Sequence, residues 1–275
     1  MQPGDLNLSS QMTGHQHSLF VCLPPSEVDS ALTQALDALG ADMENMHWVA
    51  GHPSEDAFKR GRFQFLRAQP VLSAERDLPH PRVSHANALI RLECATSEPL
   101  WRYADAVRQL IEPRGGSVEN LPGVQRPRSY TSYAMTQFAY APALAPQLGT
   151  DCPIGVVTPQ NKTAAWWAMD WMHRESFFLP RYDAQETLIA KGHALASAEG
   201  VPYIVRRNVH APEGYGQAGR YDFVPYFEFA EAHADIFRSV MAALRDVTQN
   251  PEWHYVQEGP EWWGRRVEKA SAMWE

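Results

Sequence analysis

The clearest alternation of side chains along the chain lies at residues 221–229, where the sequence reads YDFVPYFEF. Successive side chains of a strand point to opposite faces, so Phe227 and Phe229 should share one face and Tyr226 and Glu228 the other. Both faces are apolar enough to be covered by other parts of the protein. The pattern therefore predicts a buried strand in which the carboxylate of Glu228 needs a charged or hydrogen-bonding partner.

Two elements are predicted near the N-terminus, followed by a less regular segment. Residues 18–23 (SLFVCL) predict a strand, and residues 26–41 predict a helix that begins at a Ser and ends at a Gly. Residues 42–84 lack a sustained hydrophobic period, which indicates a loop-rich connection with an edge strand at 62–66 (RFQFL).

A weak internal repeat organises the rest of the chain. Residues 88–112 resemble residues 224–247, because each segment has a strand ending in a glutamate (Glu93 or Glu228), an acidic turn and an amphipathic helix. Further strands are expected after these helices, at residues 129–140 and 252–259. Two such units predict an α+β fold in which two ferredoxin-like halves join into one sheet or barrel.

The segment between the two repeats contains the candidate chemistry. Residues 183–200 (DAQETLIAKGHALASAEG) predict a helix whose apolar side carries His193, and residues 202–210 (PYIVRRNVH) predict a strand. A lone histidine on an apolar face is most often a hydrogen-bonded core residue, and a buried glutamate such as Glu228 most often pairs with an arginine. What points beyond these readings is the order in which His193, Arg206, Glu228 and Lys162 occur.

That order resembles the chlorite dismutase-like haem proteins, a family that includes the coproheme decarboxylases. The resemblance extends over about residues 85–267, and four stretches carry it. They are NKTAAWWAM (161–169), the thirteen-residue spacing of His193 and Arg206, YDFVPYFEF with the helix after it, and EWHYVQEGPEWWGRRV (252–267).

The resemblance implies a dimeric-α+β-barrel-type domain at residues 85–275 that binds haem b. Residues 1–84 would then be an N-terminal extension with an extra strand and helix. His193 would be the axial ligand of the iron, and Glu228 would accept a hydrogen bond from Nδ1 of that imidazole, which fixes its tautomer. Lys162 would pair with Glu228.

The resemblance also implies a distal side and a porphyrin contact. Arg206 would stand over the open coordination position, where a guanidinium can hold chlorite or polarise a bound peroxide. Trp166 and Trp167 would pack near the porphyrin, although as core residues they need no cofactor.

Several alternatives remain open from the sequence. The segment from Lys162 to His193 is about eight residues longer than the family leads us to expect, and it contains His173 and Tyr182, either of which competes as iron ligand. Arg207 competes with Arg206 for the distal position. Thr158 replaces the tyrosine that coproheme decarboxylases share, which argues against decarboxylation.

The leading hypothesis is a haem b enzyme that acts on chlorite or peroxide or oxidises a small organic substrate. One alternative is another haem reaction, such as dehydration of an aldoxime-like group. A second is a binding module without catalysis, with or without haem. A third is a cofactor-independent monooxygenase with His210 and Tyr226 in its pocket.

Composition limits the partners. The formal charge of −8 argues against general binding to nucleic acid or to an anionic membrane. The three cysteines, Cys22, Cys94 and Cys152, show no metal-binding spacing and are expected to be reduced in the cytoplasm. The apolar run near the start is too short for a signal peptide, so none is expected, and the C-x-x-C-H signature of covalent haem attachment does not occur. We therefore expect a small-molecule substrate, and the family resemblance implies a homo-oligomer.

Overall fold

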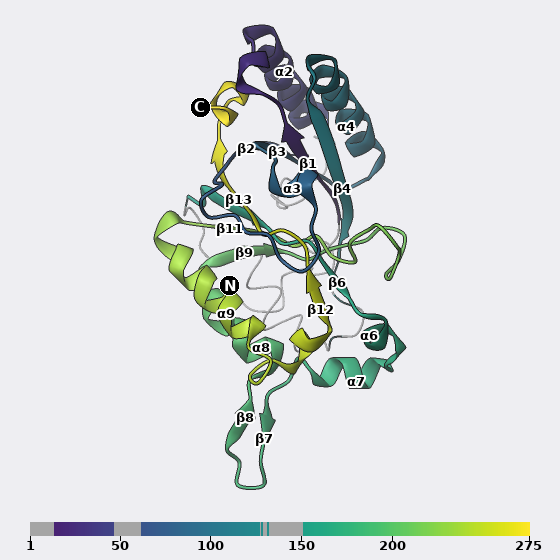
Figure 1. Cartoon of the computed structure of the whole chain (residues 1–275), viewed down its shortest axis with the longest axis vertical. Coiled ribbons are helices and arrows are strands. Elements are labelled where there is room, and N and C mark those ends of the chain that lie inside the picture. Colours follow the sequence, from purple (N-terminus) through teal and green to yellow (C-terminus); the bar gives the residue numbers. More distant parts are fainter. Residues whose placement is uncertain (1–13, 47–61, 127, 129–130, 132–150) are drawn as a thin grey trace.

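Nine antiparallel strands form one sheet in the computed structural model, which describes residues 14–46, 62–126, 128, 131 and 151–275 (Figure 1). In sheet order these strands are β10 (Val209–His210), β4 (Ser117–Gln125), β1 (Gly14–Cys22), β3 (Ala88–Cys94), β2 (Arg62–Ala68), β13 (Trp262–Val267), β5 (Ile154–Val157), β11 (Tyr226–Phe229) and β9 (Ile204–Arg207).

Helices lie between these strands. They are α2 (Ser30–Met46), α3 (Pro81–Ser84), α4 (Glu98–Ile111), α6 (Ala164–Ala168), α7 (Trp171–Ser176), α8 (Gly192–Ser197) and α9 (Ala234–Arg245). Two small sheets pair β6 (Gln160–Lys162) with β12 (Val256–Glu258) and β7 (Arg181–Tyr182) with β8 (Leu188–Ala190). None of the helices in the described part of the chain is long and apolar enough to cross a membrane.

The main sheet contains the same topology twice. The first half runs β1–α2–β2–β3–α4–β4 with the spatial order β4-β1-β3-β2. The second half takes β5, α8, β9, β11, α9 and β13 in chain order, and its spatial order β13-β5-β11-β9 is equivalent. Both are ferredoxin-like βαββαβ units. The predicted α+β fold with two ferredoxin-like halves is confirmed, and the repeat seen in the sequence corresponds to β3–α4 and β11–α9.

The two halves join into a curled sheet. Strand β13 of the second half pairs with β2 of the first. At the other end, the outermost strands β9 and β10 are consecutive in the chain and separated only by Asn208. The sheet therefore bends until its two edges meet, as the charge contact of Arg207 on β9 with Glu93 on β3, at 3.6 Å, also indicates.

Each helix layer has its own core. Helices α2 and α4 pack on the first half through residues such as Leu36, Val107 and Ile90, whereas α9 packs on the second half through Phe237 and Met241. The opposite, inner face of the sheet carries Phe20, Leu89 and Trp262 together with several buried polar residues.

Four sequence-based assignments need correction or fall outside the described residues. The predicted boundary at residue 84 does not separate the sheet, because β1, α2 and β2 are the first half of the first ferredoxin-like unit. The segment at 62–66 is an interior strand between β3 and β13, not an edge strand. The strand after the first helix is β4, and the one expected at 129–140 lies, except for Thr131, outside the described residues.

The predicted helix at residues 183–200 is wrong in its first half. The carboxylate of Asp183 accepts hydrogen bonds from the backbone N–H groups of Gln185 and Thr187, and Glu186 has a φ of 61°. Asp183 and Glu186 therefore build the turn of the β7–β8 hairpin and do not begin a helix. Helix α8 begins only at Gly192, whose φ of 61° and close approach to Leu179 suit a residue without a side chain.

Candidate functional site

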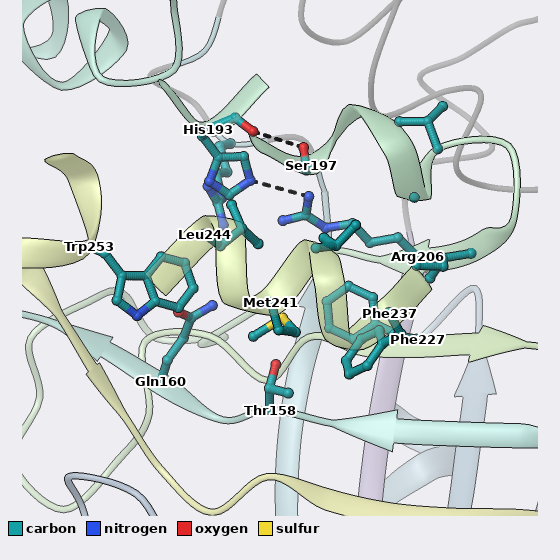
Figure 2. A pocket seen from close by; sticks show the side chains of 15 residues that line it. Thr158, Gln160, His193, Ser197, Arg206, Phe227, Phe237, Met241, Leu244 and Trp253 are labelled. Atoms are coloured by element: carbon teal, nitrogen blue, oxygen red, sulfur yellow. Dashed lines mark hydrogen bonds between the residues drawn. The ribbon is translucent and has the colours of Figure 1, made fainter. Parts of the chain in front are cut away.

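A cavity lies between the second half of the sheet and helices α8 and α9, on the face that carries Phe227 (Figure 2). It encloses about 650 Å³ of space between atoms, and part of this space is open to solvent. Most of its wall is apolar. The apolar side chains come from Val201, Ile204, Phe227, Phe237, Val240, Met241, Leu244 and Trp253.

The corresponding space in the first half of the protein is filled by side chains. There α2 and α4 lie against the sheet, and Leu32, Leu36, Leu100 and Val107 are completely buried between them. Helix α8, by contrast, has only six residues and brings Gly192, His193 and Ala196 inward. The shorter helix with smaller inward side chains leaves room in the second half.

His193 is held on the helix side of this cavity by hydrogen bonds at both its backbone and its ring. Its backbone N–H donates to the carbonyl of Phe177 at 3.1 Å, and its own carbonyl accepts from the hydroxyl of Ser197 at 2.9 Å. Nδ1 lies 2.6 Å from Oε2 of Glu252. Because a carboxylate only accepts, the proton is on Nδ1 and the lone pair is on Nε2.

Glu252 is the centre of a buried ionic cluster. Nζ of Lys162 donates to its Oε1 at 2.6 Å, and the guanidinium of Arg128 lies 3.6 Å from the same oxygen. Burial opposes ionisation of Glu252, but Lys162, His193 and Arg128 outweigh it and hold its pKa well below the usual value. The carboxylate therefore stays charged and keeps His193 oriented.

Burial also shifts the two groups bonded to Glu252. It lowers the pKa of His193 to about 4, an effect that Glu252 opposes and that Arg128 and Arg206 reinforce. The pKa of Lys162 is lowered to about 8, again mainly by burial, while Glu252 favours the charged form. At neutral pH the cluster thus contains a neutral imidazole, an anionic carboxylate and a largely protonated lysine.

Arg206 reaches the lone pair of His193 from the opposite wall. It projects from β9 on the same face as Ile204, and its NH1 lies 3.4 Å from Nε2 of His193 (Figure 2). Arg207 points to the inner face, where it contacts Glu93 at 3.6 Å. The structure therefore places Arg206, not Arg207, in the cavity.

Sequence reasoning missed three further polar residues of the cavity wall, Arg128, Gln160 and Ser197. They line it together with His193, Arg206 and Thr158. The guanidinium of Arg128 also lies over the rings of Phe178 and Phe223, at 5.2 and 5.4 Å. No local pattern marks Arg128, because it follows β4 in an irregular segment and reaches the site only through the fold.

The prediction that Glu228 binds His193 and Lys162 is wrong. Glu228 lies on the inner face of β11, on the side of the sheet away from the cavity, where it accepts a hydrogen bond from the hydroxyl of Tyr226 at 2.8 Å. A guanidinium nitrogen of Arg266 lies 3.8 Å from the same oxygen. The alternation of strand side chains that buries Glu228 also turns it away from His193, and Glu252 takes its place.

The structure also resolves the other candidates. Trp166 is fully buried behind the ionic cluster, with Nζ of Lys162 4.3 Å from its ring centre, and Trp167 stacks on Tyr215 at 4.3 Å. Neither tryptophan is among the residues that line the cavity. His173 and Tyr182 are exposed and do not line it either, so neither competes with His193.

The two residues considered for a cofactor-independent reaction lie elsewhere. His210 is completely buried, and its ring nitrogens contact the hydroxyl of Tyr215 and the carbonyl of Arg126, both at 2.9 Å. The hydroxyl of Tyr226 donates to Glu228. Both side chains are occupied within the protein and neither lines the cavity.

The donor set of the cavity fits a haem better than a bare metal ion. No group of three or more His, Cys, Asp or Glu side chains that could hold a metal ion occurs among the described residues. A structural or catalytic zinc needs at least three protein ligands. Haem iron needs only one ligand from the protein, often an imidazole, because the porphyrin supplies four nitrogen ligands. His193 offers one neutral nitrogen in a mostly apolar wall.

Comparison with solved structures decides the fold. A variant of the chlorite dismutase from Candidatus Nitrospira defluvii in complex with cyanide matches with a TM-score of 0.64 at 16% identity, over 95% of this chain and 93% of that one. A variant of the same enzyme in which an arginine is replaced by glutamate matches with a TM-score of 0.64 at 15% identity. The match covers 97% of this chain and 96% of that one. The chain has the chlorite dismutase-like fold.

Other structures with the chlorite dismutase-like fold extend the comparison. The imidazole complex of the same enzyme matches with a TM-score of 0.58 at 15% identity and 90% coverage of both chains. No protein-family model and no curated protein sequence matches this chain. Coverage of 95% and 97% of this chain in the first two matches means that the similarity extends beyond residues 85–275.

Proposed function

We propose that this protein is a haem b-dependent enzyme in which His193 is the axial ligand and Arg206 the catalytic residue. Its substrate would be a small oxidant, chlorite or peroxide, or a small oxidisable organic molecule. The observation that carries the proposal is the ring of His193, whose Nδ1 is fixed by Glu252 while Nε2 faces a mostly apolar cavity and Arg206.

Three residues would hold and tune the cofactor. His193 would bind iron through Nε2, Glu252 would keep the proton on Nδ1 and increase the basicity of the ring, and Lys162 would balance the charge of Glu252. The matched chlorite dismutase structures include complexes with cyanide and imidazole, which supports a ligand-accepting site in this fold. When bound, the haem would supply the redox chemistry that cleaves the oxidant.

Arg206 would act on the opposite side of the cavity. Its guanidinium remains cationic at any accessible pH and presents several donors in one plane, which suits a chlorite or peroxide oxygen. In the structure this group contacts Nε2 of His193, so it would have to move away for His193 to hold iron through that atom. The side chain of Arg206 is long and flexible, so its guanidinium can move away from His193 while β9 stays in place.

The chain's other residues would shape the reaction space. The rings of Phe227 and Phe237 and the side chains of Met241 and Leu244 would limit the access of water to the reacting atoms. Thr158 and Gln160 offer neutral hydrogen-bonding groups. Thr158 stands at the position where coproheme decarboxylases have a tyrosine, so this chain has no phenol there. These features favour a small polar substrate inside an apolar pocket.

Steady-state turnover tests the proposal. The haemin-loaded protein is assayed for dioxygen release from chlorite and for peroxide-dependent oxidation of a phenolic dye, beside Arg206→Ala. Loss of one charge-stabilising donor should lower kcat by about 10²- to 10³-fold. Activity that is equal in the variant would contradict the assigned role of Arg206. Full haem uptake with neither reaction would redirect the search to oxidisable organic substrates.

A further inference from the structure

The exposed apolar side chains of the described residues are concentrated in one short segment. Ten large apolar residues are exposed, and seven of them fall between residues 171 and 195. They lie on helix α7, on the segment that leads from it to β7, on the β7–β8 hairpin and on helix α8. These seven are Trp171, Met172, Leu179, Tyr182, Leu188, Ile189 and Leu195.

The hairpin itself stands away from the body of the protein. In Figure 1 it projects from the end where α6, α7 and α8 meet, and every residue from 181 to 189 is exposed. Its strands pair only with each other, with Tyr182 opposite Leu188. A two-stranded hairpin is marginally stable in water on its own, so the projecting arm is a structure that gains from a partner.

The root of the arm is firmly fixed. The backbone N–H groups of His193 and Ala194 donate to the carbonyls of Phe177 and Phe178 at 3.1 and 3.0 Å, which closes the segment at its base. Gly192 is held by the carbonyl of Gln249 at 2.9 Å. The arm is therefore presented in a defined direction, and little conformational entropy is lost when it binds.

Charge is distributed unequally along the arm. Arg181 and Lys191 lie at its root, whereas Asp183 and Glu186 lie at its turn. If two such arms lie antiparallel about a twofold axis, the acidic turn of each meets the basic root of the other, while Tyr182, Leu188 and Ile189 are covered between them. A twofold interface uses the same patch on both partners and has to be self-complementary in this way.

We propose that the β7–β8 hairpin, with α7 at its base, is the surface through which two copies of this chain pair antiparallel. The partner is a second copy because the arm carries both halves of the charge pattern beside its exposed apolar side chains. Large apolar side chains that gather on one exposed part of a protein often mark an interaction site. The pairing does not depend on haem, since none of the arm residues lines the cavity.

The mass of the full chain in solution tests the pairing. Sedimentation velocity over a concentration series is run on the wild type, on Leu188→Asp and on Val71→Asp, a matched control on the most exposed apolar side chain outside the patch. The wild type and Val71→Asp should form dimers or even-numbered assemblies. Leu188→Asp should weaken pairing by about tenfold or more, with unchanged circular dichroism and Tm.

A charge exchange distinguishes antiparallel pairing from other uses of the patch. Arg181→Glu and Glu186→Arg should each weaken pairing, and the double variant should recover it. A monomeric wild type, an unchanged mass of Leu188→Asp, or no recovery in the double variant would overturn the proposal. So would a monomer that binds phosphatidylcholine or phosphatidylglycerol vesicles through the same residues, since the patch would then face lipid.

Discussion

Nδ1 of His193 and Oε2 of Glu252 lie 2.6 Å apart although the residues are separated by 59 positions in the sequence. This contact fixes the protonated nitrogen of the imidazole and leaves Nε2 as the only ring atom able to bind iron. Glu252 in turn remains anionic because Lys162 and Arg128 surround it. In the proposed haem site, the protein would thus orient the axial histidine before the cofactor binds.

Replacement of Glu252 by glutamine tests that relationship. Without the carboxylate, His193 loses its charged acceptor and the orientation it imposes, so haem affinity should fall by about 10- to 100-fold. The matched control is Glu228→Gln, a buried glutamate on the other face of the sheet. Haemin titrations of both variants should separate them clearly. An equal loss in the two variants would contradict the assignment.

Removal of the lysine charge should destabilise the protein even without haem. In Lys162→Met, the buried carboxylate of Glu252 loses its lysine partner. It still has the hydrogen bond to His193 and the guanidinium of Arg128 at 3.6 Å. Breaking one partner of a buried ion pair costs about 3 to 5 kcal/mol, and Arg128 should hold the loss to the lower end. Urea unfolding measures it, with Lys269→Met at an exposed site as the control. Similar midpoints would show that the pair does not stabilise the fold.

Arg206 should slow the entry of haem as well as serve turnover. Its guanidinium contacts Nε2 of His193, the atom that iron must reach. A hydrogen bond of this kind contributes about 0.5 to 1.5 kcal/mol, so Arg206→Ala should bind haemin about two- to tenfold faster. Stopped-flow absorbance measures the rate, and Arg265→Ala, on β13 outside the cavity, controls for loss of a positive charge. A slower variant would mean that Arg206 guides haem into the site.

The stability of the fold should decrease as the pH falls below about 6.5. Burial lowers the pKa of His210 to about 3, with Arg128 and Arg126 adding to the effect. In the unfolded chain the ring takes up a proton near pH 6.5, whereas in the folded protein it stays neutral, so acid favours unfolding between those two values. The loss approaches about 1.4 kcal/mol per pH unit for this one proton.

Urea unfolding at pH 7, 6 and 5 measures that slope. His210→Gln removes the titrating group and should reduce the pH dependence, even if the variant is less stable at pH 7 because Tyr215 and Arg126 lose their partner. The slope is the informative quantity. An identical slope in wild type and variant would show that His210 does not titrate as its burial implies.

The sequence predicted the fold class and singled out two residues that the structure brings together in the candidate cavity. Repeated strand–helix patterns revealed two equivalent units, because the spacing of apolar residues in α4 and α9 is regular. His193 and Arg206 could be found because their positions in the chain resemble those of a known family. Both lie in the cavity, in contact through Nε2.

The rest of the candidate site depends on contacts between distant residues. The chain has 32 acidic residues, and nothing local distinguishes Glu252 from the others, whereas Glu228 stood in a conspicuous buried strand. The alternation that made Glu228 conspicuous also placed it on the inner face with Tyr226. Likewise, Asp183 could cap a helix or build a turn, and only the αL conformation at Glu186 distinguishes the two.

Binding of haemin to the wild type and to His193→Ala, followed by absorption in the porphyrin region, tests the central claim most directly. The wild type should show a sharp Soret band that saturates at one equivalent, and the variant should show a weakened or shifted band. Equal spectra in the two proteins, or no change on adding haemin to the wild type, would contradict the assignment of His193 as the iron ligand.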